Sequence, residues 1–266
     1  MLPLCHCFAT ALRPRSLETA GHRRYFIKKL YLGDKQIAFC GGDTAAFHSP
    51  FEGQTLLVTG DSITEKNFRA GKNWHDYLKE DLGFARVIND GKSGTGLTRL
   101  YSSYPSIYER IDSWPAADLI LVMASLNDGG GNNAGLPLGA LGDEGPGISY
   151  YGDCKAVIEK IIGLFPLTPL GFISPPPRGS VQDRGPTYGT GAWYRPWNRA
   201  LKEVCAAYCV PCFDLFQNSG LRPHLPQHNA KYFSCSAAPQ GDLVHPNDLG
   251  QKIMADKIRP FLEMYF

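Results

Sequence analysis

Leu56-Leu57-Val58-Thr59-Gly60-Asp61-Ser62-Ile63-Thr64-Glu65 predicts a buried strand that ends in a tight turn. A short apolar run that stops at a glycine is typical of a strand in a parallel sheet covered on both faces. Open α/β sheets bind ligands at the carboxyl ends of their strands, which is where Ser62 falls. A serine hydroxyl becomes a good nucleophile only beside a base. Taken alone, Gly-Asp-Ser favours an ordinary turn or cap, so the rest of the chain must supply the base.

Strands and helices alternate from residue 51 onward. This alternation predicts one α/β domain with a five-stranded parallel sheet between two helical layers, in a flavodoxin-like arrangement. Long loops at 129–149, 174–191 and 216–241 separate some of the elements and are candidates for binding. The predicted strands are 55–59, 86–89, 118–124, 169–173 and 211–215, and the predicted helices are about 72–82, 102–113, 152–165, a stretch after 191 that reaches Tyr208, and a last helix opened by Asn247 or Asp248.

Residues 1–50 differ from the rest of the chain. The runs 25–32 and 35–39 flank Gly33-Asp34 and predict a β-hairpin. Two strands alone are only marginally stable in water, so the hairpin needs something to pair with. We therefore expect two parts, an N-terminal extension at 1–50, which is a domain remnant or an attachment segment, and a main domain at 51–266.

The charge balance excludes several classes of partner. The chain has 27 Lys and Arg against 25 Asp and Glu, and this net charge of +2 gives no argument for nucleic acid or an acidic membrane surface.

No apolar run approaches the roughly 18–20 residues of a membrane span. Met1 to Leu12 lacks a basic region and is interrupted by Cys5-His6-Cys7, so we do not expect a signal peptide. A cytoplasmic, cell-surface or virion-associated location and the oligomeric state are left open.

The cysteines and histidines predict no metal and no cofactor. Cys205-x3-Cys209-x2-Cys212 has the spacing of iron–sulfur enzymes, but its first two members fall in a helical pattern and the third begins a strand. A cluster needs exposed thiolates on a flexible loop, so we expect buried cysteines that act as small apolar side chains. His224 and His228 share a loop, but no third ligand has suitable spacing.

Three further motifs complete a candidate site. In Asp242-Leu243-Val244-His245 the carboxylate can hydrogen-bond one ring nitrogen and leave the other free to act as a base. Gly94 lies in the loop after the second strand, where a glycine lets a backbone N–H approach a ligand. Asn127 follows the third strand, and its amide can donate to an oxyanion. Each motif alone is common in turns, but all converge on one rim of the predicted sheet.

On these residues the chain resembles the SGNH (GDSL-type) esterase and lipase hydrolases. The resemblance covers about 51–266 and includes all four family blocks in order. It implies the SGNH-hydrolase fold for 51–266, with Ser62 as the nucleophile, His245 as the general base and Asp242 as its orienting acid. It also implies an oxyanion hole built from the backbone N–H groups of Ser62 and Gly94 and the amide of Asn127. The matching blocks are Gly60-Asp61-Ser62, Asn89 to Gly94, Asn127-Asp128, and Asp242 with His245.

The chain departs from the family pattern at two positions. Ser125 stands where the third block normally begins with glycine, and its side chain is expected to narrow the site. Ile63 replaces the usual leucine of the first block. The Gly-x-Ser-x-Gly elbow of α/β-hydrolases is absent, which argues against that other fold.

The resemblance implies hydrolysis of a carboxylic ester. The rim loops hold polar side chains and no long apolar lid, which favours a short acyl group on a polar alcohol, such as an O-acetylated carbohydrate. A lysophospholipase or thioesterase acting on lipids is the alternative, and a carbohydrate-binding or phage-tail-associated module on the same fold is another. A flavodoxin-like nucleotide binder is disfavoured, because two acids follow the first strand where phosphate would bind. The rim residues are Asn132, Asn133, Arg178, Tyr188 and Trp193.

Overall fold

The computed structural model describes residues 30–32, 35–37, 49–98, 103–128, 137–179 and 194–266. The chain divides into two compact units, Met1–Phe47 and His48–Phe266. In the first unit, β1 (Leu30–Leu32) pairs antiparallel with β2 (Lys35–Ile37). The remainder of the predicted hairpin lies outside the described residues, and the predicted boundary after residue 50 stays a prediction.

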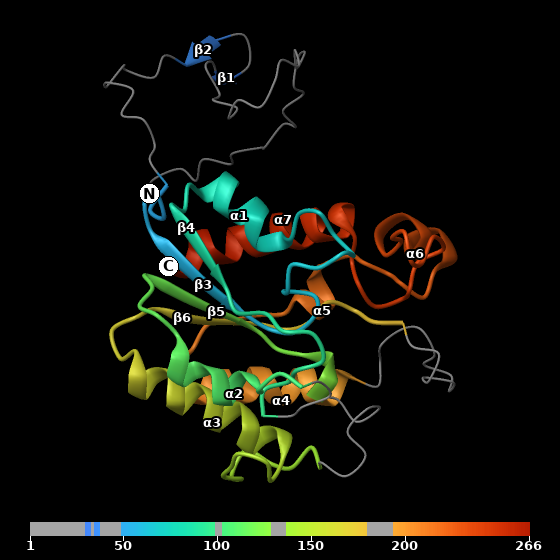
Figure 1. Ribbon diagram of the computed structural model, residues 1–266. Coiled ribbons are helices and arrows are strands. Elements are labelled where there is room, and N and C mark those ends of the chain that lie inside the picture. Colours follow the sequence, from blue (N-terminus) through green and yellow to red (C-terminus); the bar gives the residue numbers. More distant parts are fainter. Residues whose placement is uncertain (1–29, 33–34, 38–48, 99–102, 129–136, 180–193) are drawn as a thin grey trace, which may run out of the picture. The chain divides into compact units, whose positions relative to one another are not determined.

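The second unit is organised around a five-stranded parallel sheet with the order β4-β3-β5-β6-β7. Numbered along this unit, the order is 2-1-3-4-5, which is that of flavodoxin-like sheets. The predicted fold class is therefore confirmed. Figure 1 shows the strands side by side, with β3 inside the sheet. The strands are β3 (Thr55–Thr59), β4 (Arg86–Asn89), β5 (Leu119–Met123), β6 (Leu170–Ile173) and β7 (Cys212–Phe213).

Helices cover both faces of this sheet (Figure 1). Leu56 and Val58 belong to the core on one face, whereas Leu57 between them belongs to the core on the other. This alternation follows from the two-residue period of a strand, and it explains why the central strands are apolar throughout. On the first face lie α1 (Trp74–Leu82) and α7 (Asp248–Tyr265), and on the second lie α2 (Ile107–Arg110), α3 (Tyr150–Leu164) and α4 (Arg195–Ala207). No helix in the described part of the chain is both long and apolar enough to cross a bilayer.

The structure corrects the sequence-based boundaries mainly in the C-terminal half. Strand β7 stops at Phe213, because the Asp214 side chain accepts the N–H of Gln217 at 3.0 Å and caps α5 (Leu215–Asn218). The predicted strand 211–215 is therefore wrong after Phe213. The predicted loop 216–241 contains most of α5 and also α6 (Pro226–Tyr232). The predicted helix at 102–113 is shorter and consists of α2 followed by the 3₁₀ turn η1 (Ile111–Ser113).

The cysteine prediction is only partly right. Cys205 is buried in α4 and Cys212 is half-buried in β7, but Cys209 is exposed and has a φ of +54°. It follows the end of the helix, where the chain reverses direction toward β7. Within the described ranges, no three metal-ligating side chains come together.

Asp76 at the start of α1 leads to the first testable prediction. Its pKa is lowered to about 2, chiefly by the neighbouring His75 ring, and its Oδ2 accepts the Asn73 N–H at 2.9 Å. A carboxylate whose folded-state pKa lies below its ordinary value stabilises the fold above that ordinary value, and the contribution disappears as the pH falls through the folded-state pKa. We expect Asp76→Asn to lower the free energy of unfolding by about 1 kcal/mol at neutral pH.

Urea denaturation of both proteins between about pH 7 and pH 2.5 checks this, because the difference between them should shrink as the acid is protonated. The control is Asp112→Asn, since Asp112 is a largely exposed partner of Lys160 and such surface pairs contribute little. A destabilisation by Asp76→Asn that stays constant with pH would contradict the assignment.

Candidate active site

The turn after β3 is shaped by Asp61 and presents Ser62. Asp61 Oδ1 accepts the N–H of Ile63 at 2.9 Å, and its carbonyl oxygen accepts the N–H of Glu65, also at 2.9 Å. Gly60 is needed before this turn, because a Cβ there would lie 2.5 Å from Thr64 Oγ1. The glycine and the aspartate of the motif therefore fix the backbone that carries the serine hydroxyl.

A continuous line of hydrogen bonds joins Ser62, His245 and Asp242. Ser62 Oγ lies 2.8 Å from His245 Nε2, and His245 Nδ1 lies 2.6 Å from Asp242 Oδ2. The serine and the histidine are 183 positions apart in the sequence. The structure thus brings together the three side chains that the sequence proposes as a catalytic set.

Backbone bonds hold the Asp242 carboxylate in place. Its Oδ1 accepts the N–H groups of Val244 at 2.9 Å and His245 at 2.7 Å. Leu243, between Asp242 and Val244, has a φ of +68°, which non-glycine residues rarely adopt, so the turn is strained. Burial alone would raise the pKa of Asp242, but the hydrogen bonds from the His245 ring and backbone hold it below its ordinary value.

Helix α7 is fastened to the serine turn. The side chain of Asn247 caps the helix by accepting the N–H of Leu249 at 3.1 Å. Gln251 in its first turn donates through Nε2 to Ile63 O at 3.1 Å and accepts the Trp74 N–H at 3.0 Å. The first turn of α7, which begins three residues after His245, is therefore hydrogen-bonded to Ile63, the residue after Ser62.

The oxyanion candidates lie on loops that are bonded to each other. Lys92 N–H donates to Gly60 O at 3.1 Å, and the Asn127 side-chain amide donates to Thr95 O at 3.0 Å. Gly94 has a φ of +76°, in the region that favours glycine. Among the residues that the structure describes, no acceptor takes the backbone N–H of Ser62 or Gly94. Both N–H groups are therefore candidates for binding a ligand atom.

Arg110 is a supporting residue that sequence reasoning missed. Its guanidinium is only 6% exposed, and it donates to Thr59 Oγ1 at 3.2 Å and to Asp90 O and Asp90 Oδ2 at 3.0 Å each. It also donates to Thr95 Oγ1 at 3.3 Å. Arg110 thereby ties the loop that carries Gly94 to the end of β3. The local sequence gives no signal of this role, because Glu109 and Asp112 flank Arg110 and make an exposed position equally plausible.

Ser125 does not project into the site. Its side chain is fully buried, and it bridges Asp61 and the backbone of Asn127. The expectation that Ser125 narrows the site is therefore not supported, because the hydroxyl is used inside the protein.

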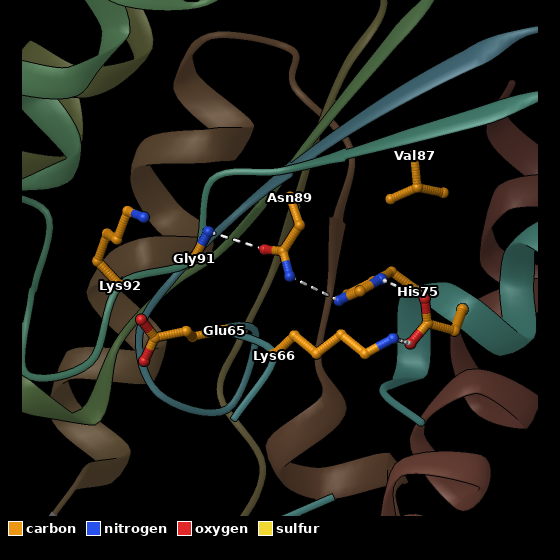
Figure 2. A pocket seen from close by; sticks show the side chains of 8 residues that line it. Glu65, Lys66, His75, Val87, Asn89, Gly91 and Lys92 are labelled. Atoms are coloured by element: carbon orange, nitrogen blue, oxygen red, sulfur yellow. Dashed lines mark hydrogen bonds and ion pairs between the residues drawn. The ribbon is translucent and has the colours of Figure 1, made fainter. Parts of the chain in front are cut away.

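A cavity of about 380 Å³ lies beside the edge strand β4, and the Ser62, Asp242 and His245 side chains do not line it. Figure 2 shows Gly91 donating to Asn89, whose amide in turn contacts the buried His75. Both bonds involve Asn89, which precedes the loop that carries Gly94. The residues around the cavity therefore support the candidate site and do not form it. Its lining residues are Glu65, Lys66, His75, Asp76, Val87, Asn89, Gly91 and Lys92.

Two arginines lie near the Asp242 turn. Arg69 Nε is 3.9 Å from Asp242 Oδ2. Arg178 is partly buried, and its Nε has no hydrogen-bond partner among the described residues. Burial lowers the pKa of Arg178, whereas the charges of Asp61 and Asp242 raise it. The next residue, Gly179, donates to Leu243 O at 2.8 Å and holds this loop against the turn. The other predicted rim residues, Asn132, Asn133, Tyr188 and Trp193, lie outside the described residues.

A parallel α/β sheet with serine, imidazole and carboxylate hydrogen-bonded in line at its rim has the arrangement of a serine hydrolase. Residues 58–253 match the model of the GDSL-like lipase/acylhydrolase family, and the chain belongs to that family. The protein is therefore an ester hydrolase. A search of curated proteins finds no match.

Several solved structures resemble this chain. A protein from Lactobacillus plantarum is 29% identical with a TM-score of 0.66, and the match covers 81% of this chain and 99% of that one. A possible lipase from Chitinophaga pinensis is 21% identical with a TM-score of 0.57, over 78% and 96%. An inhibitor-bound aryl esterase from M. smegmatis is 15% identical with a TM-score of 0.51, over 80% and 100%. The last two likenesses show the fold alone.

Proposed function

We propose that the protein hydrolyses short-chain acyl esters, with Ser62 as the nucleophile, His245 as the general base and Asp242 as the orienting acid. The observation that carries this proposal is the pair of contacts at 2.8 Å and 2.6 Å that links the three side chains. Both distances are within the reach needed for proton transfer. Asp242 accepts a hydrogen bond from the Nδ1–H of His245. In that tautomer the Nε2 of His245 carries no proton, faces Ser62 and can take up the serine proton.

The reaction would proceed in two halves. Ser62 Oγ attacks the ester carbonyl while His245 Nε2 takes the hydroxyl proton, and the carbonyl oxygen becomes an oxyanion. The C–O bond to the alcohol then breaks, and His245 returns the proton to the departing alkoxide. Water attacks the acyl-serine with the same proton transfers and releases the carboxylic acid and the free enzyme.

The oxyanion is proposed to be held by the backbone N–H groups of Ser62 and Gly94 and by the amide of Asn127. The backbone N–H groups of Ser62 and Gly94, which have no acceptor among the described residues, and the bond that places Asn127 beside Thr95 support this assignment. Fixed donors of this kind stabilise charge that develops only in the transition state, so they act on kcat more than on KM.

Asn127→Ala is expected to lower kcat by about 10²–10³-fold with little change in KM, because it removes one oxyanion donor. Steady-state kinetics with p-nitrophenyl acetate measure both parameters. Asn218→Ala is the matched control, since that exposed amide also donates to a backbone oxygen, at 2.7 Å, but lies in α5. An unchanged kcat in Asn127→Ala removes this residue from the hole.

The proposed natural substrate is an O-acetyl group on a carbohydrate. Arg69 and Arg178 beside the Asp242 turn support a polar alcohol, because guanidinium groups donate to sugar hydroxyl and carboxylate oxygens. A lysophospholipase or thioesterase activity remains the second candidate, on the family membership alone.

A substrate panel separates these candidates. We expect p-nitrophenyl acetate to be cleaved with a kcat/KM at least about tenfold above that of the decanoate, and acetylated oligosaccharides to release acetate. Arg178→Ala should raise KM about tenfold for the acetylated sugar and much less for p-nitrophenyl acetate. The control is Arg259→Ala on the exposed side of α7, where the guanidinium pairs with Glu263. Preference for the long chain would favour the lipid hydrolase instead.

The division of the chain is part of the same proposal. Residues 51–266 would form the hydrolase domain, and residues 1–50 would form an N-terminal extension, either a domain remnant or a segment that attaches the domain to another structure. A carbohydrate-binding or phage-tail-associated module on this fold is the rival, and covalent labelling of Ser62 discriminates between the two.

A further inference from the structure

We infer that Ser125 is a positioning residue that holds Asn127 in place for the oxyanion by linking it to Asp61 of the serine turn. This inference rests on the proposed function, because it assigns Ser125 a role that acts through Asn127. It gives a function to the residue that departs from the glycine of the resembled family.

The direction of each hydrogen bond in the link is determined. The backbone N–H of Asn127 can only donate, so Ser125 Oγ accepts it at 2.9 Å. The hydroxyl proton of Ser125 is then directed to Asp61 Oδ2, 2.6 Å away. A short bond from a hydroxyl to a carboxylate is among the stronger hydrogen bonds in proteins. Both side chains are buried, with Ser125 0% and Asp61 4% exposed, so water does not replace a lost partner.

Asp61 carries the link onward to the nucleophile. Its other oxygen, Oδ1, accepts the N–H of Ile63, the residue that follows Ser62. Burial raises the pKa of Asp61 above its ordinary value, and the bonds from Ser125 and Ile63 oppose that rise. One carboxylate therefore bonds both to the turn that carries the attacking hydroxyl and, through Ser125, to the backbone of an oxyanion donor.

The backbone of Ser125 is fixed independently of its side chain. Tyr194, which is fully buried, donates its hydroxyl to Ser125 O at 2.8 Å, and the preceding Ala124 donates its N–H to Ile173 O at 2.9 Å. Asn127 lies two residues after Ser125, in the 3₁₀ turn η2 (Leu126–Asp128). Its amide is bonded to Thr95 O, and its backbone is bonded to Ser125. Removing the Ser125 hydroxyl releases the second anchor while leaving the first.

The predicted effect is on catalysis rather than binding. A small displacement of a preorganised donor reduces the stabilisation of the transition state more than that of the bound substrate. We expect Ser125→Ala to lower kcat for p-nitrophenyl acetate about tenfold, with KM changed less than about twofold. Removing a hydroxyl from a buried network also destabilises the fold, so kinetics are measured well below the melting temperature of the variant.

A double-mutant cycle with Asn127→Ala tests whether Ser125 acts through Asn127. If it does, Ser125→Ala lowers kcat about tenfold in the wild-type background and less than about twofold in the Asn127→Ala background. Equal losses in both backgrounds, or a wild-type kcat in Ser125→Ala, overturn the inference. A wild-type kcat in Asn127→Ala itself would instead refute the proposed oxyanion hole, so the two failures are distinguishable.

The chain offers a matched control in Ser174. It is also a fully buried serine that follows a strand, and its Oγ accepts the Phe216 N–H at 2.9 Å and lies 3.4 Å from Asp214 Oδ1. Ser174→Ala should destabilise the protein comparably without coupling to Asn127. If Ser125→Ala does not fold, Ser125→Gly replaces it in the cycle, because it removes the same two bonds without placing a methyl group among polar atoms.

Discussion

Ser62→Ala is expected to abolish ester hydrolysis while the protein stays folded. The substitution removes the atom that would attack the carbonyl, and in serine hydrolases such a loss lowers kcat by about 10⁶-fold. The remaining oxyanion donors would sustain only a slow attack by water. The Ser62 side chain makes one described hydrogen bond, to His245, so we expect a stability change of about 1 kcal/mol or less.

Two measurements check this expectation. Turnover of p-nitrophenyl acetate is compared with that of Ser113→Ala, whose hydroxyl donates only to Arg110 O at 2.8 Å, among the described contacts, and lies in η1. A fluorophosphonate probe should label the wild-type protein at Ser62 and leave Ser62→Ala unmodified. Wild-type turnover in the variant refutes the nucleophile assignment. A folded wild-type protein that the probe does not label would favour the carbohydrate-binding module.

The sheet could be predicted because its evidence is local. The runs around Leu57, Ile120 and Phe172 contain no polar side chain, and this pattern is typical of short strands buried on both faces. The errors fall where a single side chain decides a boundary. Asp214 ends β7 by capping α5, and an aspartate in that place is equally compatible with a continuing loop.

The supporting residues of the site were harder to predict than the proposed catalytic ones. Ser62, Asp242 and His245 stand in short motifs with fixed spacing, and the resemblance to a known family names them directly. Ser125 contacts Asp61, which is 64 positions away, and Arg110 contacts Thr59, which is 51 positions away. Nothing in the local sequence of Ser125 or Arg110 specifies those partners. The sequence suggested that the Ser125 side chain narrows the ester site, because the contact between Ser125 and Asp61 depends on the fold and leaves no local pattern.

Asp242→Asn is expected to lower kcat by about 10⁴-fold, although the two side chains have nearly the same shape. In the wild-type protein Asp242 Oδ1 accepts two backbone N–H groups, and Oδ2 accepts from His245 Nδ1. An asparagine can keep the backbone bonds only by placing its oxygen at the Oδ1 position. Its NH₂ group then faces Nδ1, which must become an acceptor, so the ring proton moves to Nε2.

In that tautomer the Nε2–H group would point at Ser62 Oγ, 2.8 Å away, and the ring could no longer take the serine proton. The fall should therefore appear in kcat with KM nearly unchanged, in steady-state kinetics with p-nitrophenyl acetate. Asp248→Asn is the matched control, because Asp248 Oδ1 also accepts two backbone N–H groups, from Gly71 at 2.6 Å and Lys72 at 3.2 Å, but contacts no proposed catalytic residue in the described structure. Activity of Asp242→Asn within about tenfold of wild type would show that the orientation of the histidine does not depend on this carboxylate.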